Sequence, residues 1–282
     1  MRVAVIGASG FLGRHVLADL AAKGIETIAT SRSGAIAHAH PGQSVAALDC
    51  DAPPADPFEA LGNPDVVIHL AWGGLPNYRS LHHFESELPR QYRLLATLAR
   101  CGLRHLVVAG TCFEYGMASG ALSESLTPAP ANPYGFAKNA LREQLTFLRA
   151  ETGVSLAWAR LFYIYGEGQG PRSLYSQLRA AVAAGEPSFP MSGGEQLRDF
   201  LDVQEVARLL VALALQAGDP GVVNICSGRP ISVRNLVERW ISENGWDIAL
   251  ELGRYPYPDY EPLAFWGERN KLDRILRIDN AG

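Results

Sequence analysis

The sequence predicts an α/β fold: a doubly wound parallel sheet with helices on both faces and a small discontinuous C-terminal cap. Short apolar, β-branched runs alternate with helical patterns along most of the chain. A glycine-rich turn joins the first strand to the first helix, and the alternation breaks after about residue 162. This order implies parallel pairing, because each connecting helix must cross over the sheet between neighbouring strands.

The first strand, 2–6, leads directly into a glycine-rich turn, and a helical pattern follows it. A Gly-x-x-Gly-x-x-Gly turn in that context is typical of a Rossmann-like dinucleotide site. Gly7 permits the tight turn, Gly10 lets backbone approach a pyrophosphate at the helix N-terminus, and Gly13 lets the helix pack on the strand. The predicted cofactor contacts in this turn are Gly7, Ser9, Gly10, Phe11, Leu12 and Gly13.

The second strand, 26–30, ends in Ser31-Arg32 and carries no acidic residue there. An NAD site usually places a carboxylate at this point against the ribose 2′-hydroxyl. A serine and an arginine suit a 2′-phosphate better, so the sequence favours NADP. If Arg32 instead stacks on adenine or faces solvent, NAD binds as well.

Later elements continue the alternation of strands and helices. Strands are expected at 65–71, 104–110, 155–161 and 222–225, and helices at 84–100, 134–150, 173–184, 203–216 and 232–244. The Pro/Tyr-rich segment 255–262 is expected to fold over a site as a loop. We therefore assign 1–162 and 203–230 to a dinucleotide-binding domain, and 163–202 and 231–282 to the cap.

Composition narrows the class of protein. Hydrophobic residues make up 48% of the chain, charged residues 19%, and the net charge is −4, as in a soluble globular protein. This charge predicts no nucleic-acid partner, and no apolar run is long enough to predict a membrane span. The scattered cysteines predict reduced thiols and a cytoplasmic protein: Cys50, Cys101, Cys112 and Cys226. The histidines, His82-His83 among them, are expected to be polar loop residues, and no metal site is predicted.

Tyr134 and Lys138 stand at i and i+4, just after the helix-start signal Asn132-Pro133. Both side chains therefore leave one face of the expected helix. An ammonium beside a phenol lowers the pKa of the phenol from about 10, so that it can exchange a proton with a sugar or alcohol oxygen. By itself the pattern also fits an exposed helix face, but the dinucleotide turn favours catalysis.

With these motifs the chain resembles the extended short-chain dehydrogenase/reductase family, in its branch of nucleotide-sugar epimerases, dehydratases and reductases. The glycine turn, the strand at 65–71, Tyr134-x-x-x-Lys138 and residues 194–200 occur in the order of that family. The resemblance implies that Tyr134 is the catalytic acid/base and that Lys138 lowers its pKa and holds the nicotinamide ribose. It also implies that the Thr111 hydroxyl bonds to the reacting oxygen.

Further binding roles are also implied by the resemblance. Asp49 would bind the adenine amino group, and the backbone of Leu70 and Ala71 would line the cofactor groove. Arg198 would pair with the substrate diphosphate; the alternative for it is a salt bridge to Asp199 or Asp202.

Two departures from the family pattern bear on the reaction. Cys112-Phe113 stands where the 4,6-dehydratases have Asp-Glu, and neither side chain can eliminate water, so dehydration is not expected. Tyr163 stands where the family usually has an asparagine that touches the diphosphate. The predicted substrate contacts are Thr111, Cys112, Tyr163 and Arg198.

The resemblance leaves three functions open. The favoured one is an NADP-dependent reductase of a nucleoside-diphosphate 4-keto-6-deoxysugar, acting at C4. The alternative is an NAD-dependent nucleotide-sugar 4-epimerase. A dinucleotide-sensing regulator without catalysis is disfavoured, because such relatives typically lose the tyrosine or the lysine. The resemblance also implies a homodimer formed through the helices expected at 84–100 and 134–150.

Overall fold

A seven-stranded parallel sheet forms the centre of the computed structural model, which describes residues 1–216 and 218–277. The strands lie in the order β12-β7-β5-β4-β1-β2-β3. Their bounds are β1 Arg2–Ile6, β2 Glu26–Ser31, β3 Gln43–Ala47, β4 Val66–His69, β5 His105–Thr111, β7 Ser155–Leu161 and β12 Gly221–Ile225. Every neighbouring pair in this sheet is parallel, so the predicted Rossmann-like sheet is confirmed.

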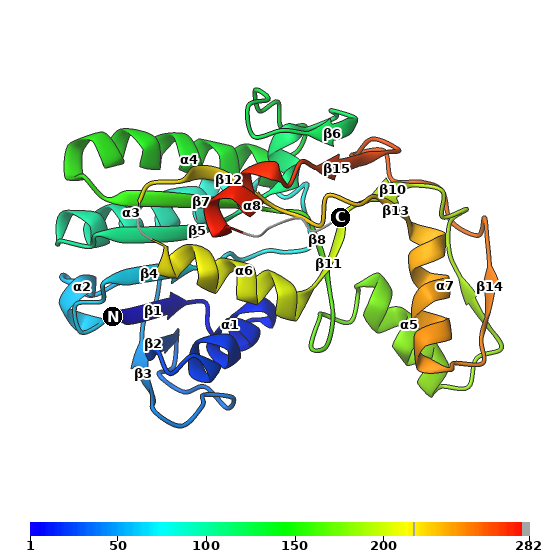
Figure 1. Cartoon of the computed structure of the whole chain (residues 1–282), viewed down its shortest axis with the longest axis horizontal. Helices are drawn as coiled ribbons and strands as arrows, with labels where there is room; N and C mark the ends of the chain where they lie inside the picture. The colour runs from blue at the N-terminus through cyan, green and yellow to red at the C-terminus, as the bar shows by residue number, and fades with distance from the viewer. Residues whose placement is uncertain (217, 278–282) are drawn as a thin grey trace.

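Helices cover both faces of this sheet (Figure 1). On one face α1 (Phe11–Ala22) packs against α6 (Val203–Leu215), and α8 (Asn270–Leu276) contacts α6 and β12. On the other face α3 (Leu88–Arg100) packs against α4 (Pro133–Thr152), with the short α2 (Pro57–Ala60) beside α3. Alternate residues of β1 enter the two apolar cores, because side chains of a strand alternate between faces: Val3 and Val5 in one, Ala4 and Ile6 in the other.

The start of α4 follows from its sequence. The Asn132 side chain accepts a 2.8 Å hydrogen bond from the Gly135 N–H, and Pro133 occupies the first turn. Gly153 ends the helix at φ 73°, in the left-handed region that glycine adopts without strain. This capped first turn places Tyr134 and Lys138 at the carboxyl end of β5.

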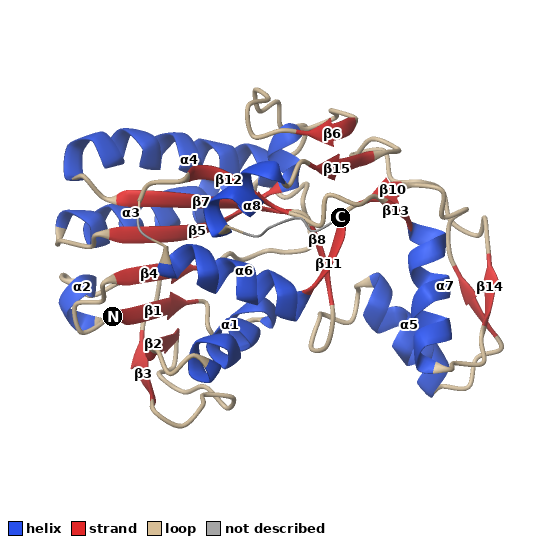
Figure 2. Cartoon of the chain, viewed as in Figure 1, coloured by secondary structure: helices blue, strands red, loops and turns tan. Residues whose placement is uncertain are grey.

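The cap lies beyond the carboxyl ends of the sheet strands (Figure 2). It is built from α5 (Leu174–Ala183), α7 (Val233–Asn244) and the parallel pair of β9 (Ser188–Pro190) with β14 (Ala249–Glu251), around a third apolar core. Three further strand pairs join it to the sheet. They are β8 (Tyr163–Tyr165) with β11 (Phe200–Asp202), β10 (Leu197–Arg198) with β13 (Ile231–Ser232), and β6 (Gly120–Leu122) with β15 (Phe265–Gly267).

Some elements differ from the sequence-based expectation. The helix expected at 84–100 begins with a π-helical turn, η1 (His83–Glu87), before α3. Helix α8 was not expected, and its Leu272 packs in the core that α1 and α6 share, although 231–282 was assigned to the cap. Residues 278–282 of that range lie outside the described residues. The division into two domains stays a prediction. Within the described chain, none of the helices combines the length and apolar character that crossing a membrane requires.

Candidate active site

In the turn between β1 and α1, the glycine positions lie very close to neighbouring backbone atoms. Gly7 has φ +88°, and a Cβ there would lie 2.7 Å from the Ala71 nitrogen. A Cβ on Gly13 would lie 2.6 Å from the Ala8 oxygen, so both positions require glycine. Gly10 caps α1 without a side-chain hydrogen bond, and the first turn of α1 carries no acidic residue. A helix N-terminus with its N–H groups uncapped and no carboxylate beside it fits the pyrophosphate of a dinucleotide.

A cavity of about 410 Å³ joins this turn to the expected catalytic residues. Thr111, Tyr134 and Lys138 line it, together with predicted cofactor and substrate contacts: Gly7, Gly10, Phe11, Leu12, Gly13, Leu70, Cys112 and Tyr163. Ser9 and Ala71 belong to the same two loops but are not among its lining residues. The fold thus brings together segments that are far apart in the sequence.

The predicted adenine-side residues lie at the carboxyl end of β2. Ser31 Oγ donates to the Ala35 carbonyl at 2.9 Å and accepts from the Ala35 N–H at 3.0 Å. Arg32 Nε lies 4.0 Å from an Asp49 carboxylate oxygen, and the Arg32 side chain is 80% exposed. This loose pair leaves the guanidinium accessible to a 2′-phosphate.

Thr111 ends β5 and caps the short helix η2 (Cys112–Tyr115). Its backbone N–H donates to Glu114 at 2.8 Å, and its hydroxyl accepts from the Phe113 N–H at 3.3 Å. The fully buried Glu114 carboxylate also accepts from Trp158 Nε1 at 2.9 Å and from Arg160 Nε at 2.8 Å. Sequence reasoning missed Glu114, although Thr-x-x-Glu is a readable capping-box signal.

Lys138 is buried, and its ammonium donates to the Ala109 carbonyl at 2.8 Å. It lies 4.0 Å from the ring centroid of Trp72 and 6.0 Å from that of Tyr134. Burial lowers the pKa of Lys138 from 10.5 to about 7, although Glu114 and Glu87 oppose this shift. Both the charged and the neutral form of Lys138 are therefore populated near neutral pH.

The pKa of Tyr134 moves opposite to the expected direction. Burial raises it above its usual value of 10 and the Tyr78 phenol adds to the rise, while a hydrogen bond with Thr111 lowers it. The expectation that Lys138 lowers the pKa of Tyr134 is therefore wrong for this arrangement. The physical reason is that desolvation of the phenol dominates, and the ammonium lies over Trp72.

A buried polar network lies behind the site. His69 Nε2 bonds to Gln91 Oε1 at 2.8 Å, and Gln91 Nε2 donates to Glu87 at 3.0 Å. Burial and the charge of Lys138 lower the pKa of His69 to about 4, which keeps that imidazole neutral. His83 is fully buried, so the expectation of a polar loop histidine is wrong for it, whereas His69 is buried in β4, within the strand expected at 65–71. Within residues 1–216 and 218–277, no group of three or more His, Cys, Asp or Glu is arranged to hold a metal.

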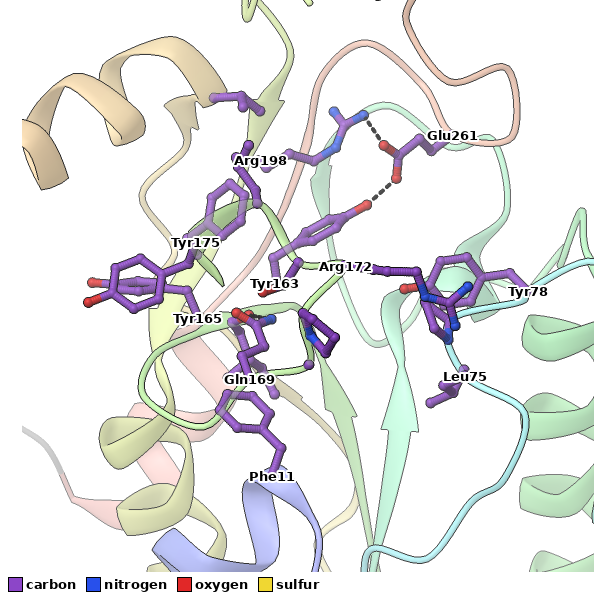
Figure 3. Close-up of a pocket in the computed structure, with 18 of the residues that line it drawn as sticks. Phe11, Leu75, Tyr78, Tyr163, Tyr165, Gln169, Arg172, Tyr175, Arg198 and Glu261 are labelled. Carbon is purple, nitrogen blue, oxygen red and sulfur yellow. Dashed lines mark hydrogen bonds and ion pairs between the residues drawn. The ribbon is translucent and has the colours of Figure 1, made fainter. Parts of the chain in front are cut away.

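A second cavity, of about 880 Å³, adjoins the first and opens toward the cap (Figure 3). The residues that line both cavities include Phe11 of α1, Tyr78 of the loop after β4, and Tyr163. Aromatic side chains dominate its cap side: Tyr165, Tyr175, Phe200, Trp240 and Tyr260. The Pro/Tyr-rich segment contributes Tyr260 and Glu261, as a loop over a site was expected to do.

Arg198 is buried in the wall of this larger cavity (Figure 3). Its Nη1 donates to the Leu197 and Leu263 carbonyls at 2.9 Å each, and its Nη2 lies 2.9 Å from a Glu261 oxygen. The Tyr163 hydroxyl donates to the other Glu261 oxygen. The ion-pair partner of Arg198 is thus Glu261, neither Asp199 nor Asp202, and sequence reasoning missed it.

Known proteins resemble the chain over nearly its whole length. It is 30% identical over 272 residues to dTDP-6-deoxy-L-talose 4-dehydrogenase (NAD(+)) of Aggregatibacter actinomycetemcomitans, covering 95% of this chain and 100% of that protein. It is 33% identical over 292 residues to dTDP-6-deoxy-L-talose 4-dehydrogenase (NAD(P)(+)) of Kitasatospora kifunensis, covering 100% of this chain and 90% of that protein.

A solved structure and a family model agree with these relatives. MoeE5 in complex with UDP-glucose and NAD superposes with a TM-score of 0.81 at 28% identity, covering 98% of this chain and 92% of MoeE5. The model of the NAD dependent epimerase/dehydratase family matches residues 3–226, the segment that holds the glycine turn, Thr111, Tyr134 and Lys138. The chain belongs to the NAD-dependent epimerase/dehydratase family.

Proposed function

We propose that the protein is an NADP-dependent reductase of a nucleoside-diphosphate 4-keto-6-deoxysugar. The observation that carries this proposal is the 410 Å³ cavity, which joins the glycine turn to Thr111, Tyr134 and Lys138. Two relatives are named as 4-dehydrogenases of a dTDP-6-deoxysugar. Oxidation of a C4 hydroxyl is the reverse of reduction of a C4 ketone, so their names support the same reaction class.

Each catalytic residue has its own role in the reduction of the C4 ketone. A nicotinamide dinucleotide on the glycine turn would supply the hydride. Tyr134, whose pKa burial raises, keeps its phenolic proton at neutral pH and donates it to the C4 oxygen. The Thr111 hydroxyl donates a hydrogen bond to that oxygen as negative charge develops. Lys138 supplies the nearby positive charge and binds the cofactor ribose.

The larger cavity is the proposed site of the nucleotide part of the substrate. Its aromatic walls offer stacking surfaces, and Arg198 lies in the wall beside Tyr163. Cys112, which lines the catalytic cavity, is held as a neutral thiol because burial raises its pKa. Neither it nor Phe113 offers the acid and base that elimination of water requires, which supports a reductase over a dehydratase.

NADP is the proposed cofactor because Arg32 is exposed at the end of β2, where the ribose 2′ position is expected. The same catalytic residues would serve an NAD-dependent nucleotide-sugar 4-epimerase. Two relatives that are each 24% identical to this chain are named UDP-glucose 4-epimerase, which favours that second function.

The test is a panel of 4-keto sugar nucleotides with NADPH and with NADH, followed by cofactor absorbance. A reductase consumes the cofactor in proportion to substrate, whereas an epimerase carries bound NAD and shows no net change. Tyr134→Phe is expected to lower turnover about a hundredfold with cofactor affinity nearly intact. Tyr255→Phe, at a side chain 55% exposed, is the control. A wild-type rate in Tyr134→Phe would remove Tyr134 from the mechanism.

We also propose that the enzyme is a cytoplasmic homodimer. All four cysteines are free, as a reducing compartment requires.

The proposed dimer contact is on helix α4. This helix leaves Phe136 53% and Phe147 76% exposed, an apolar surface suited to the same face of a second copy. Phe147→Glu should turn the dimer into a monomer in sedimentation experiments.

A further inference from the structure

The loop after β4 places an indole against the catalytic lysine. Trp72 lines the 410 Å³ cavity, and the Lys138 ammonium lies 4.0 Å from its ring centroid. The ammonium is buried, and its hydrogen bond at 2.8 Å goes to the Ala109 carbonyl. A cation is attracted to the face of an aromatic ring, most strongly to tryptophan and most strongly when desolvated. The face of the Trp72 indole therefore stabilises the charge of Lys138.

The indole is itself held in place. Trp72 Nε1 donates to His83 Nδ1 at 3.1 Å, and the two ring planes lie 26° apart with their centroids 6.4 Å apart. Since an indole nitrogen only donates, His83 Nδ1 must be the acceptor, and the imidazole is neutral with its proton on Nε2. That Nε2 donates to the Asn77 carbonyl at 2.8 Å. Burial lowers the pKa of His83, which favours this neutral form.

The same two rings also contact the catalytic phenol. Trp72 meets Tyr134 edge to face, with ring centroids 6.1 Å apart, and the His83 centroid lies 5.2 Å from that of Tyr134. We propose that Trp72 is a positioning residue, whose indole face holds the Lys138 ammonium beside Tyr134 and whose own orientation is set by His83. This proposal rests on the proposed function only through the role that function gives Lys138.

Other groups around the ammonium act on the same equilibrium. Glu114 of η2 and Glu87 of η1 favour its charged form, and burial opposes it. His69 of β4 is neutral near pH 7 because its pKa is about 4, and Tyr134 of α4 is neutral because burial raises its pKa. The Trp72 ring face favours the charged form of Lys138, as the two carboxylates do. A weaker interaction with the ring should therefore lower the pKa of Lys138.

The experiment measures the pKa of Lys138 directly in the free protein. Lys23, Lys138 and Lys271 are the lysines of the sequence, so lysine labelled at its ε-carbon gives a simple NMR titration. Trp72→Leu should lower the pKa of Lys138 by about one pH unit, and Trp72→Phe by less, because a smaller ring face remains. The signals of Lys23 and Lys271 are internal controls. An unchanged or raised pKa of Lys138 in Trp72→Leu would overturn the proposal.

Fluorinated tryptophan tests the ring face without changing its shape. Stepwise fluorination weakens the attraction to a cation, so the pKa of Lys138 should fall stepwise in otherwise wild-type protein. The same labelling in Trp72→Phe controls for the other tryptophans, including Trp158 beside Glu114. A fall that persists in Trp72→Phe would assign the effect to those tryptophans and reject the proposal. This readout needs no folded Trp72→Leu variant.

Turnover connects the titration to catalysis. At a pH well above 7, a drop of one unit in the pKa of Lys138 leaves about a tenfold smaller charged fraction. The kcat of Trp72→Leu should fall by about that factor at high pH and recover at lower pH. A shifted titration with an unshifted kcat profile would reject the link to the proposed function, and the contact between Trp72 and Lys138 would still stand.

Discussion

The Glu114 carboxylate accepts a 2.8 Å hydrogen bond from the backbone N–H of Thr111, directly behind the hydroxyl proposed to bind the substrate. The same carboxylate pairs with Arg160, and the two side chains are 0% and 1% exposed. The guanidinium of Arg160 also lies 4.3 Å from the ring centroid of Tyr115. One buried ion pair thus anchors the end of β5, where the catalytic threonine is placed.

Glu114→Gln should therefore destabilise the protein strongly. The amide keeps an acceptor for the Thr111 N–H but leaves the Arg160 charge buried and unpaired, which costs about 3–5 kcal/mol. Urea unfolding at neutral pH measures the loss. Glu143→Gln is the matched control, because Glu143 pairs with Arg142 at the surface with 51% exposure, and its loss should stay below about 1 kcal/mol. Equal losses in the two variants would contradict the assigned role of the buried pair.

Acid should weaken the fold through Glu87. Burial alone would raise the pKa of this carboxyl, but hydrogen bonds from Arg90, Gln91 and the Gly73 N–H outweigh it and lower the pKa from 4.5 to about 2. Between these values the unfolded chain binds more protons than the folded one. The stabilisation is therefore fully present above pH 4.5 and is lost as the pH falls toward 2, up to about 3 kcal/mol.

The measurement is the free energy of unfolding at a series of acidic pH values. Glu87→Gln should flatten the acid slope, because the amide does not titrate in this range. Glu151→Gln, at a surface carboxyl of α4 whose pKa is lowered by a hydrogen bond from Arg100, should flatten the slope much less, because water screens that exposed pair. A slope that survives in Glu87→Gln would assign the acid sensitivity to other carboxyls.

Arg32→Ala should separate the two dinucleotides. The exposed guanidinium is proposed to bind the 2′-phosphate, so its loss should weaken NADPH binding about tenfold and leave NADH binding nearly unchanged. Calorimetric titration with both cofactors measures the two affinities. Arg239→Ala, at a side chain of α7 that is 44% exposed, controls for a general loss of positive charge. Equal weakening of both cofactors would place Arg32 away from the 2′ position.

Glu261→Gln should tighten substrate binding. Glu261 neutralises Arg198 in the wall of the larger cavity, so the neutral amide leaves the guanidinium charge free for an anionic diphosphate. The KM for the nucleotide sugar should fall about threefold to tenfold with kcat unchanged. Asp259→Asn, two residues earlier and paired with the exposed Arg79, should leave KM unchanged. A higher KM in Glu261→Gln would show that the carboxylate itself binds the substrate.

Local sequence patterns predicted most of the fold. The β-branched run of β1, the glycines that follow it and the Asn132-Pro133 start of α4 act through neighbours in sequence, and each element lies where these signals place it. The i and i+4 spacing also places Tyr134 and Lys138 on one helix face, since that relation depends on helix geometry alone. Parallel order and the close backbone approach at Gly7 follow from the same signals.

Tertiary structure decided the partners and the charge states. Glu114 meets Arg160, Arg198 meets Glu261, and Trp72 meets Lys138 across long stretches of chain. Such pairs depend on which surfaces the packed sheet and cap bring together, which no local spacing encodes. The pKa of Tyr134 shows the same limit: its sequence neighbour Lys138 predicted a fall, whereas burial, a property of the folded interior, raises it.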